Sequence, residues 1–324
     1  MTGAWALCMM FLTVAVAAWS VGVLLSTAAQ RLLIPTLGVP QARLRWMAVS
    51  AALPCLLPAA WVAALGLIAL SKPAGWLDDH CQSHGGVHAH LCFEHFPDLM
   101  IAPLVVVLLG LLLLVPISLI ARSIGAALQR RRRLRSLLSL LPSGGLIRRI
   151  DFGQPLALVA RPFKPVVVIS RSLLDGLGRR ERRVVLAHEA AHLRQKDLFK
   201  TALFETLLAL HWPPSASRLR ALWHQAIEER ADDCVARQFG TLDTASVLIK
   251  VVRQQRSLAF GGLSVSGAGV TRRIERLIEG PEPTDSRPPS LAGWALLAVL
   301  LGTAWPLAAE HHAVETFLSR ILSG

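Results

Sequence analysis

Four long apolar runs divide the sequence, at about residues 5–29, 46–70, 101–121 and 290–310. Each is close to the roughly 20 residues that a helix needs to cross the hydrocarbon core of a bilayer. Buried helices of soluble proteins can be equally apolar. Four such runs in one chain, with tryptophan near several ends, nevertheless favour membrane spans. The pattern therefore predicts a mainly α-helical membrane protein with four transmembrane helices.

The first run is uncharged, and no Lys or Arg precedes Arg31. A secretory signal peptide has a basic start and a shorter apolar stretch, so we predict that this run is retained as an anchor. Residues 1–121 then form an N-terminal membrane domain with three spans and a connecting loop at 71–99. Residues 122–289 form a separate domain, 290–310 the fourth span, and 311–324 a short tail.

Basic residues predict the orientation of these parts. Arg31, Arg43 and Arg45 lie between the first two spans, and a basic group that includes Arg130 to Arg133 follows the third. Residues 71–99 contain one Lys and no Arg. Because cytoplasmic loops are enriched in Lys and Arg, we expect an outside N-terminus, a cytoplasmic segment at 122–289 and an outer tail. This is the topology of a multi-pass protein of the bacterial cytoplasmic (inner) membrane.

The cytoplasmic segment predicts an α+β domain. Two runs rich in branched residues, at 156–160 and 166–169, are typical of strands. Apolar periodicity and Gly or Pro punctuation predict helices at about residues 170–177, 179–196, 198–211, 218–239 and 244–255. Residues 261–269 are rich in Gly and Ser and predict a mobile link.

The net charge of +13 changes this picture little. Much of it lies beside span ends, where basic side chains fix topology and contact anionic lipid headgroups. Nothing in the chain resembles a base-reading module, so we expect the lipid bilayer, and not nucleic acid, as the partner of these charges.

The strongest chemical signal is His188-Glu189-Ala190-Ala191-His192, in the middle of a predicted helix. Residues four apart project from the same helical face, so His188 and His192 can hold one zinc ion. Glu189 can reach the open coordination position as a general base. One alternative is a surface helix with two unrelated histidines, but the apolar flanks of the motif argue against it. A second alternative is a structural zinc site, but such a site usually has four ligands. The motif predicts a zinc peptide hydrolase.

A catalytic zinc ion needs a third protein ligand, and residues 228–233 offer two pairs of acids spaced by four. Glu229 and Asp233 fall on a helical stripe with Leu222 and Ala226, where an acid is costly unless it is coordinated or paired. This favours Glu229 as the third ligand and Asp233 as the acceptor that orients a ligand histidine. Glu228 and Asp232 remain the alternatives.

These residues resemble the membrane metallopeptidases of the BlaR/MecR antirepressor type. The resemblance rests on four segments and on the plan of three spans before the domain and one after it. The segments are Pro165 to Ser170, Leu186 to Asp197, His211-Trp212-Pro213 and Glu229 to Asp233. It implies a gluzincin-like zinc domain that cleaves itself or a cytoplasmic winged-helix transcriptional repressor after an external signal. It also implies Glu229 rather than Glu228 as ligand.

Two departures from the family pattern matter. Asp232 stands where the family usually has Cys, and only a short tail follows the fourth span, where β-lactam sensors of the family carry a penicillin-binding domain. We therefore do not expect direct acylation of this chain by a β-lactam. The stimulus, and whether the chain forms a homodimer, stay open.

The outer loop is a second candidate site. It gathers five of the eleven histidines and two of the five cysteines. They are His80, Cys81, His84, His88, His90, Cys92 and His95. Such ligands can bind zinc or copper, which would make the loop a sensor with a second metal ion. The alternative is a Cys81–Cys92 disulfide, which would persist on the outer side.

Three functions compete on these grounds. The first is a regulatory zinc endopeptidase of the antirepressor type. The second is a quality-control membrane protease resembling the HtpX or CAAX-prenyl-protease group. The third is a signalling relay without catalysis, which would have no need of Glu189 as a general base.

Overall fold

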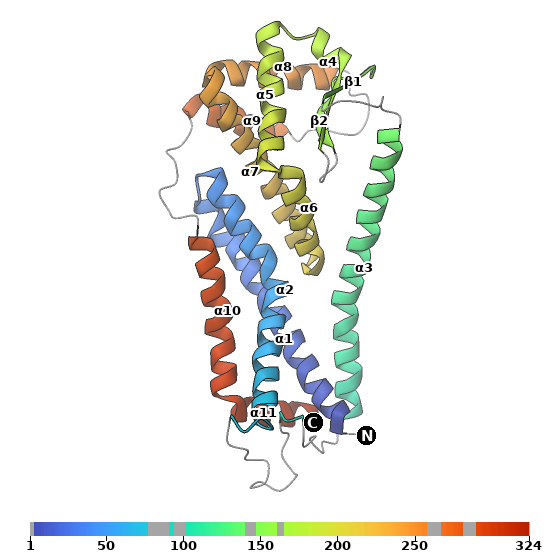
Figure 1. The fold of residues 1–324 in the computed structure, drawn as a ribbon, viewed down its shortest axis with the longest axis vertical. Helices are drawn as coiled ribbons and strands as arrows, with labels where there is room; N and C mark the ends of the chain where they lie inside the picture. Colours follow the sequence, from blue (N-terminus) through green and yellow to red (C-terminus); the bar gives the residue numbers. More distant parts are fainter. Residues whose placement is uncertain are drawn as a thin grey trace.

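The computed structural model describes residues 3–76, 91–93, 101–139, 147–160, 165–257, 267–280 and 290–323 of the chain. It has two halves along its long axis (Figure 1). Long, roughly parallel helices form the lower half, and a small sheet with shorter helices forms the upper half. Both chain ends lie at the lower end.

The lower half contains helices α1 (Gly3–Leu32), α2 (Pro40–Ser71), α3 (Pro103–Ser139) and α10 (Leu291–Ala309). All four are long and apolar enough to cross a membrane, which agrees with the four predicted spans. A short 3-10 helix, η1 (Ile34–Thr36), joins α1 to α2. The two helices approach closely at Gly22, where a Cβ atom would lie 2.9 Å from the carbonyl oxygen of Leu53. Small residues permit such contacts between membrane helices.

The upper half is built on a three-stranded sheet in the order β1 (Ile147–Ile150), β3 (Val166–Ser170), β2 (Ala157–Ala160). β1 pairs with β3 in parallel and β2 with β3 antiparallel. The helices of this half are α4 (Arg171–Asp175), α5 (Arg179–Gln195), α6 (Asp197–Leu207), η3 (Leu208–Leu210), α7 (Pro213–Phe239), α8 (Thr241–Ser257) and α9 (Gly267–Glu279). The central strand β3 is fully buried, and Val167 and Ile169 pack against Val184 and Val185 of α5.

The two halves share a hydrophobic core. Met47 and Ala51 of α2 pack with Phe204 of α6 and with Leu219 and Trp223 of α7 in one buried cluster. Phe204 stacks on Trp223 with ring centroids 4.1 Å apart.

Polar contacts join the same surfaces. Trp19 Nε1 donates to the carbonyl of Leu210 at 3.0 Å, and His211 Nε2 donates to that of Ala51 at 3.2 Å. The chain segment from α6 to the start of α7 therefore packs directly on the spans.

The lower end carries a further helix, α11 (His311–Ser323), which lies across the ends of the spans (Figure 1). Glu315 of α11 is buried and pairs with Lys72 at 2.8 Å, and it accepts from the backbone N–H of Leu91 at 2.8 Å. Leu318 and Leu322 pack against residues of α1 and α2. The sequence-based prediction of a short tail did not include this helix.

Of the predicted outer-loop site, only Cys92 lies within the described residues, where it is buried. The other six members, His80, Cys81, His84, His88, His90 and His95, lie outside them. Both the second metal ion and the Cys81–Cys92 disulfide therefore stay predictions.

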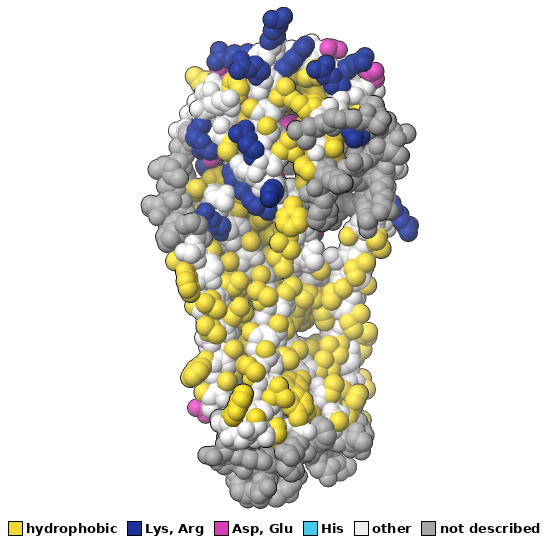
Figure 2. Space-filling view, viewed as in Figure 1, with side chains coloured by type: hydrophobic (Ala, Val, Ile, Leu, Met, Phe, Trp, Pro, Cys, Tyr) yellow, Lys and Arg dark blue, Asp and Glu magenta, His cyan; other side chains and the backbone are white. Residues whose placement is uncertain are grey.

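Surface character also separates the halves (Figure 2). Hydrophobic side chains cover much of the lower half, whereas Lys and Arg gather over the upper half. The apolar half is the one that contains the four candidate membrane spans.

Candidate metal centre

The two motif histidines face each other from successive turns of α5. Their Nε2 atoms lie 3.1 Å apart, and their ring centroids are 4.7 Å apart. Gly178 is the N-cap residue of α5, and its backbone N–H donates to the Glu181 carboxylate at 2.7 Å, which satisfies one free donor at the start of the helix. The spacing of four residues then places both rings on one face, as expected.

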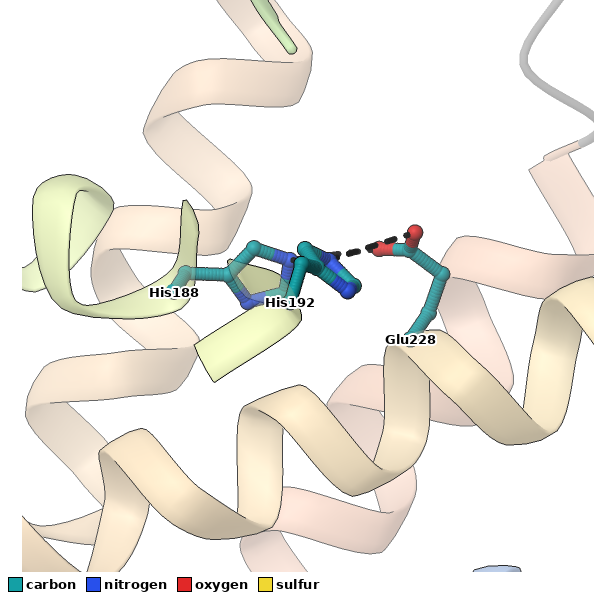
Figure 3. Close-up of side chains that lie close together, drawn as sticks. All are labelled: His188, His192 and Glu228. Atoms are coloured by element: carbon teal, nitrogen blue, oxygen red, sulfur yellow. Dashed lines mark hydrogen bonds and ion pairs between the residues drawn. The ribbon is translucent and has the colours of Figure 1, made fainter. Parts of the chain in front are cut away.

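Glu228 of α7 completes the group (Figure 3). One carboxylate oxygen lies 3.3 Å from His188 Nε2 and the other lies 3.7 Å from His192 Nε2. His188, His192 and Glu228 each offer one donor atom, and these three atoms lie within 4.8 Å of one another. Two imidazoles from α5 and one carboxylate from α7 thus lie close enough together to bind one ion.

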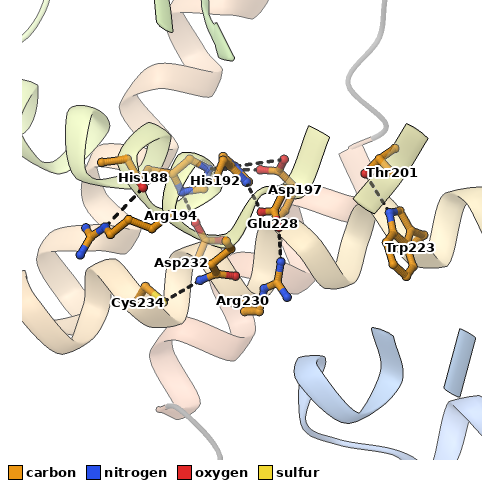
Figure 4. A network of polar contacts seen from close by, with 12 residues as sticks. His188, His192, Arg194, Asp197, Thr201, Trp223, Glu228, Arg230, Asp232 and Cys234 are labelled. Carbon is orange, nitrogen blue, oxygen red and sulfur yellow. Dashed lines mark hydrogen bonds and ion pairs between the residues drawn. The ribbon is translucent and has the colours of Figure 1, made fainter. Parts of the chain in front are cut away.

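Each histidine is oriented from behind by a carboxylate (Figure 4). His188 Nδ1 lies 3.1 Å from Asp232 Oδ1, and His192 Nδ1 lies 2.8 Å from Asp197 Oδ2. A carboxylate on the far ring nitrogen fixes the tautomer and ring orientation of a metal-ligating histidine. Both Nε2 atoms are therefore held ready to accept a cation.

A sharp turn positions Asp197. Helix α5 ends at Gln195 and α6 begins at Asp197. Lys196, between them, adopts a left-handed conformation with φ 55°. The chain changes direction at Lys196, so Asp197 lies beside His192 at the end of α5. Arg230 of α7 donates to the other oxygen of Asp197, and a second guanidinium nitrogen of Arg230 donates to Gln41 of α2 at 2.8 Å.

The structure does not bring Glu229 and Asp233 to the histidines. Glu229 is 1 % exposed and pairs with Arg43 of α2, and Asp233 pairs with Arg276 of α9 at 3.3 Å. The assignment of Glu229 as the third ligand and of Asp233 as the acceptor that orients a ligand histidine therefore does not fit the geometry. Glu228 lies at the Nε2 atoms of both histidines, and Asp232 lies at Nδ1 of His188. The apolar stripe of α7 faces other helices, where arginines pair with the acids that it carries.

Glu189 points into the same space. It lines a cavity of about 430 Å³ together with His188, His192 and Glu228. Burial raises the pKa of Glu189 above the usual range of a carboxyl group, although the nearby histidines act in the opposite direction. A raised pKa moves this carboxylate toward the range in which it exchanges protons at neutral pH.

Apolar and polar walls extend the cavity away from the histidines. Ala157, Leu158 and Val159 of β2 form one wall, and Leu198, Thr201, Ala202 and Glu205 line another from a single face of α6. In the described part of the chain, β2 pairs only with β3 and forms one edge of the sheet. An extended peptide can add to such an edge through main-chain hydrogen bonds.

The donor set fits zinc. Ligand atoms about 2.0–2.1 Å from a tetrahedral zinc ion lie roughly 3.3 Å from one another. The two Nε2 atoms lie 3.1 Å apart here, and they lie 3.3 and 3.7 Å from the two different oxygens of Glu228. With one donor atom from each residue, all three atoms lie within 4.8 Å of one another, so a small adjustment of the carboxylate would give these separations. Three protein ligands with one open position are the pattern of catalytic rather than structural zinc sites.

The electrostatics of the centre favour a cation. Burial disfavours a charge on His188, but the hydrogen bonds that its ring N–H groups donate to Asp232 and Glu228 outweigh this effect and raise the pKa of His188 to about 10. The same contacts hold the pKa of the Glu228 carboxyl well below its usual range against the effect of burial. The acids around the imidazoles thus stabilise positive charge at the point where the three donors meet.

Comparison with known proteins identifies a family match over part of the chain. A family model described as BlaR1 peptidase M56 matches residues 149–215, a segment that contains His188, Glu189, His192 and Asp197 and ends before Glu228. No curated protein and no solved structure matches the chain. The family match confirms the resemblance to the BlaR/MecR type and implies peptidase activity.

Proposed function

We propose that this chain is a membrane zinc endopeptidase in which His188, His192 and Glu228 hold the metal ion and Glu189 is the general base. The observation that carries the proposal is the convergence of two imidazole Nε2 atoms and a carboxylate, with each imidazole oriented by a further carboxylate. Glu189, next to the first ligand, lines the same cavity.

Zinc, when bound, would polarise the scissile carbonyl and an attacking water. The protein supplies the remaining parts of the reaction. A substrate strand laid along the edge of β2 brings its carbonyl to the histidines, because β2 and the metal group line one cavity. Glu189 accepts the proton of the attacking water and passes it to the leaving amine, and no covalent enzyme intermediate forms.

The proposed setting is the bacterial cytoplasmic membrane, with the upper half in the cytoplasm and the N-terminus and α11 outside. The basic surface of the upper half and the apolar spans support this orientation. The proposed substrate is the chain itself or a cytoplasmic winged-helix repressor, cleaved in response to an external signal. This follows from the likeness to the antirepressor type.

The test compares purified full-length wild-type protein with Glu189→Gln, both in detergent and loaded with zinc. Fluorescein-labelled casein and self-cleavage, followed by mass spectrometry, are the two readouts. We expect the variant to bind zinc as the wild type does and to lose cleavage by at least about 100-fold, the size of a general-base contribution. Chelation should abolish cleavage in the wild type, and zinc should restore it.

Each outcome separates the candidate functions. Self-cleavage without casein hydrolysis supports a regulatory peptidase, whereas general hydrolysis of casein favours a quality-control protease. If cells that carry Glu189→Gln respond to the signal as wild-type cells do, signalling does not depend on peptide cleavage, and the relay is supported.

A further inference from the structure

Three arginines of α9 contact the acidic run of α7. Arg272 Nε lies 3.5 Å from Glu229, Arg276 Nη2 lies 3.3 Å from Asp233, and Arg273 contacts Glu228 and Asp232. Val270 and Leu277 of α9 are buried, and Leu277 packs with Ala236 and Ala245 of the neighbouring helices. Helix α9 is therefore fixed on α7 by ion pairs and by an apolar contact.

Arg273 differs from the other two because of the acids that it contacts. Its Nε and Nη2 atoms donate to the two oxygens of Asp232, at 2.7 and 2.9 Å, and its Nη1 lies 3.1 Å from Glu228 Oε2. All three guanidinium nitrogens are thus engaged. Asp232 and Glu228 are the acids that contact His188, at Nδ1 and Nε2.

The position of the Arg273 guanidinium offsets the repulsion between Asp232 and Glu228. Two carboxylates directed at one imidazole repel each other, and Asp232 is 3 % exposed, so water screens this repulsion poorly. A guanidinium between them offsets the repulsion and fixes both side chains through its planar fork. Lysine carries the same charge but cannot reproduce that fork.

We propose that Arg273 is a positioning residue of the metal centre, which holds Asp232 behind His188 and Glu228 in front of it. The centre is then complete only while α9 is packed on α7. This inference rests on the proposed zinc site, but it concerns metal affinity and does not depend on which peptide is cleaved.

The chain offers a matched control. The Arg273 and Arg276 side chains are both 14 % exposed, and each pairs with an acid of α7. Asp233, the partner of Arg276, does not contact the histidines in the described structure. Arg276→Gln therefore weakens the packing of α9 without touching the metal centre, whereas Arg273→Gln does both.

The experiment measures zinc affinity of the full-length protein in detergent, by competition with a chromophoric chelator, for wild type, Arg273→Gln, Arg273→Lys and Arg276→Gln. Loss of a contact that supports a metal ligand lowers affinity about 10- to 100-fold. We expect that loss for Arg273→Gln, a smaller loss of at least about fivefold for Arg273→Lys, and a change within about twofold for Arg276→Gln.

Thermal unfolding in the presence of chelator reports the packing of α9 separately. Wild-type zinc affinity in Arg273→Gln would overturn the proposal, and so would an equal loss in Arg276→Gln, which would assign the effect to packing alone. If Arg273→Gln does not fold, Arg273→Lys decides the question by the same criterion. If the wild-type chain binds zinc but cleaves no substrate, the proposed function is refuted, and the affinities of the variants still test the role of Arg273. If the wild-type chain binds no zinc, both the proposed function and the role of Arg273 are overturned.

Discussion

Replacing Glu229 by Gln is expected to destabilise the fold and to leave zinc affinity close to the wild-type value. Glu229 is 1 % exposed and Arg43, its partner from α2, is 4 % exposed. Removing one member of a buried ion pair leaves an uncompensated charge, at a cost of about 3–5 kcal/mol. Arg272, the second partner, has a side chain that is 61 % exposed, so its contact with Glu229 adds little.

The neighbouring substitution should have the opposite effect. The side chain of Glu228 is 38 % exposed, so Glu228→Gln should change stability in the presence of chelator by no more than about 1 kcal/mol. It removes the proposed third metal ligand. Zinc affinity should therefore fall by more than about 100-fold, the upper value for residues that only orient a ligand.

Two measurements on the purified full-length variants separate these effects. Tryptophan fluorescence follows thermal unfolding in chelator, and competition with a chromophoric chelator gives zinc affinity. At roughly 2–4 °C per kcal/mol, Glu229→Gln should lower the melting temperature by about 6–20 °C. If Glu229→Gln instead lost zinc and kept its melting temperature, while Glu228→Gln bound zinc normally, the assignment of the third ligand would be wrong.

Two further predictions test other parts of the site and its support. Asp197→Asn should lower zinc affinity about 10- to 100-fold, because His192 loses the acceptor that orients it, whereas Asp233→Asn should not; equal affinities in the chelator competition would contradict this role. His211 is buried, and burial lowers its pKa despite the hydrogen bond to Ala51. The unfolded chain therefore takes up a proton first as the pH falls, and stability should decrease below about pH 6.5. His211→Gln should flatten the melting temperature between pH 7 and 5, and an unchanged slope would show that other groups control it.

The spans and the histidine motif could be predicted from sequence because each follows from a local pattern. Apolar runs indicate α1, α2, α3 and α10, and the i, i+4 spacing places His188 and His192 on one face. The predicted strands at 156–160 and 166–169 correspond to β2 and β3. β1, Ile147–Ile150, escaped prediction because it is short and contains two arginines.

Helix boundaries were harder to predict at proline and glycine, because these residues can either interrupt a helix or form its first turn. The sequence predicts a gap between helices at about 198–211 and 218–239, but Pro213 and Pro214 occupy the first turn of α7, where a missing N–H is tolerated. Residues 267–269, part of the predicted mobile link, begin α9.

The third ligand could not be chosen from one helix. Helical periodicity places Glu229 and Asp233 on the same face of α7, as the structure has them. It does not show which side chains of other helices pack against that face. Arg43 comes from 186 residues earlier in the chain and Arg276 from 43 residues later, and both satisfy acids that appeared to require a metal ion. The same long-range contacts leave Glu228 and Asp232 for His188.

The core shared by α2, α6 and α7 has a practical consequence for dissecting the protein. A fragment cut at the predicted boundaries, residues 122–289, would carry Glu229 without Arg43 and Arg230 without Gln41. It would also expose Phe204, which packs on α2 in the intact chain. We therefore expect this fragment to be less stable than the same residues in the intact chain. We also expect the orientation of His192 to be less well fixed in it, because Gln41 holds Arg230 and Arg230 contacts Asp197.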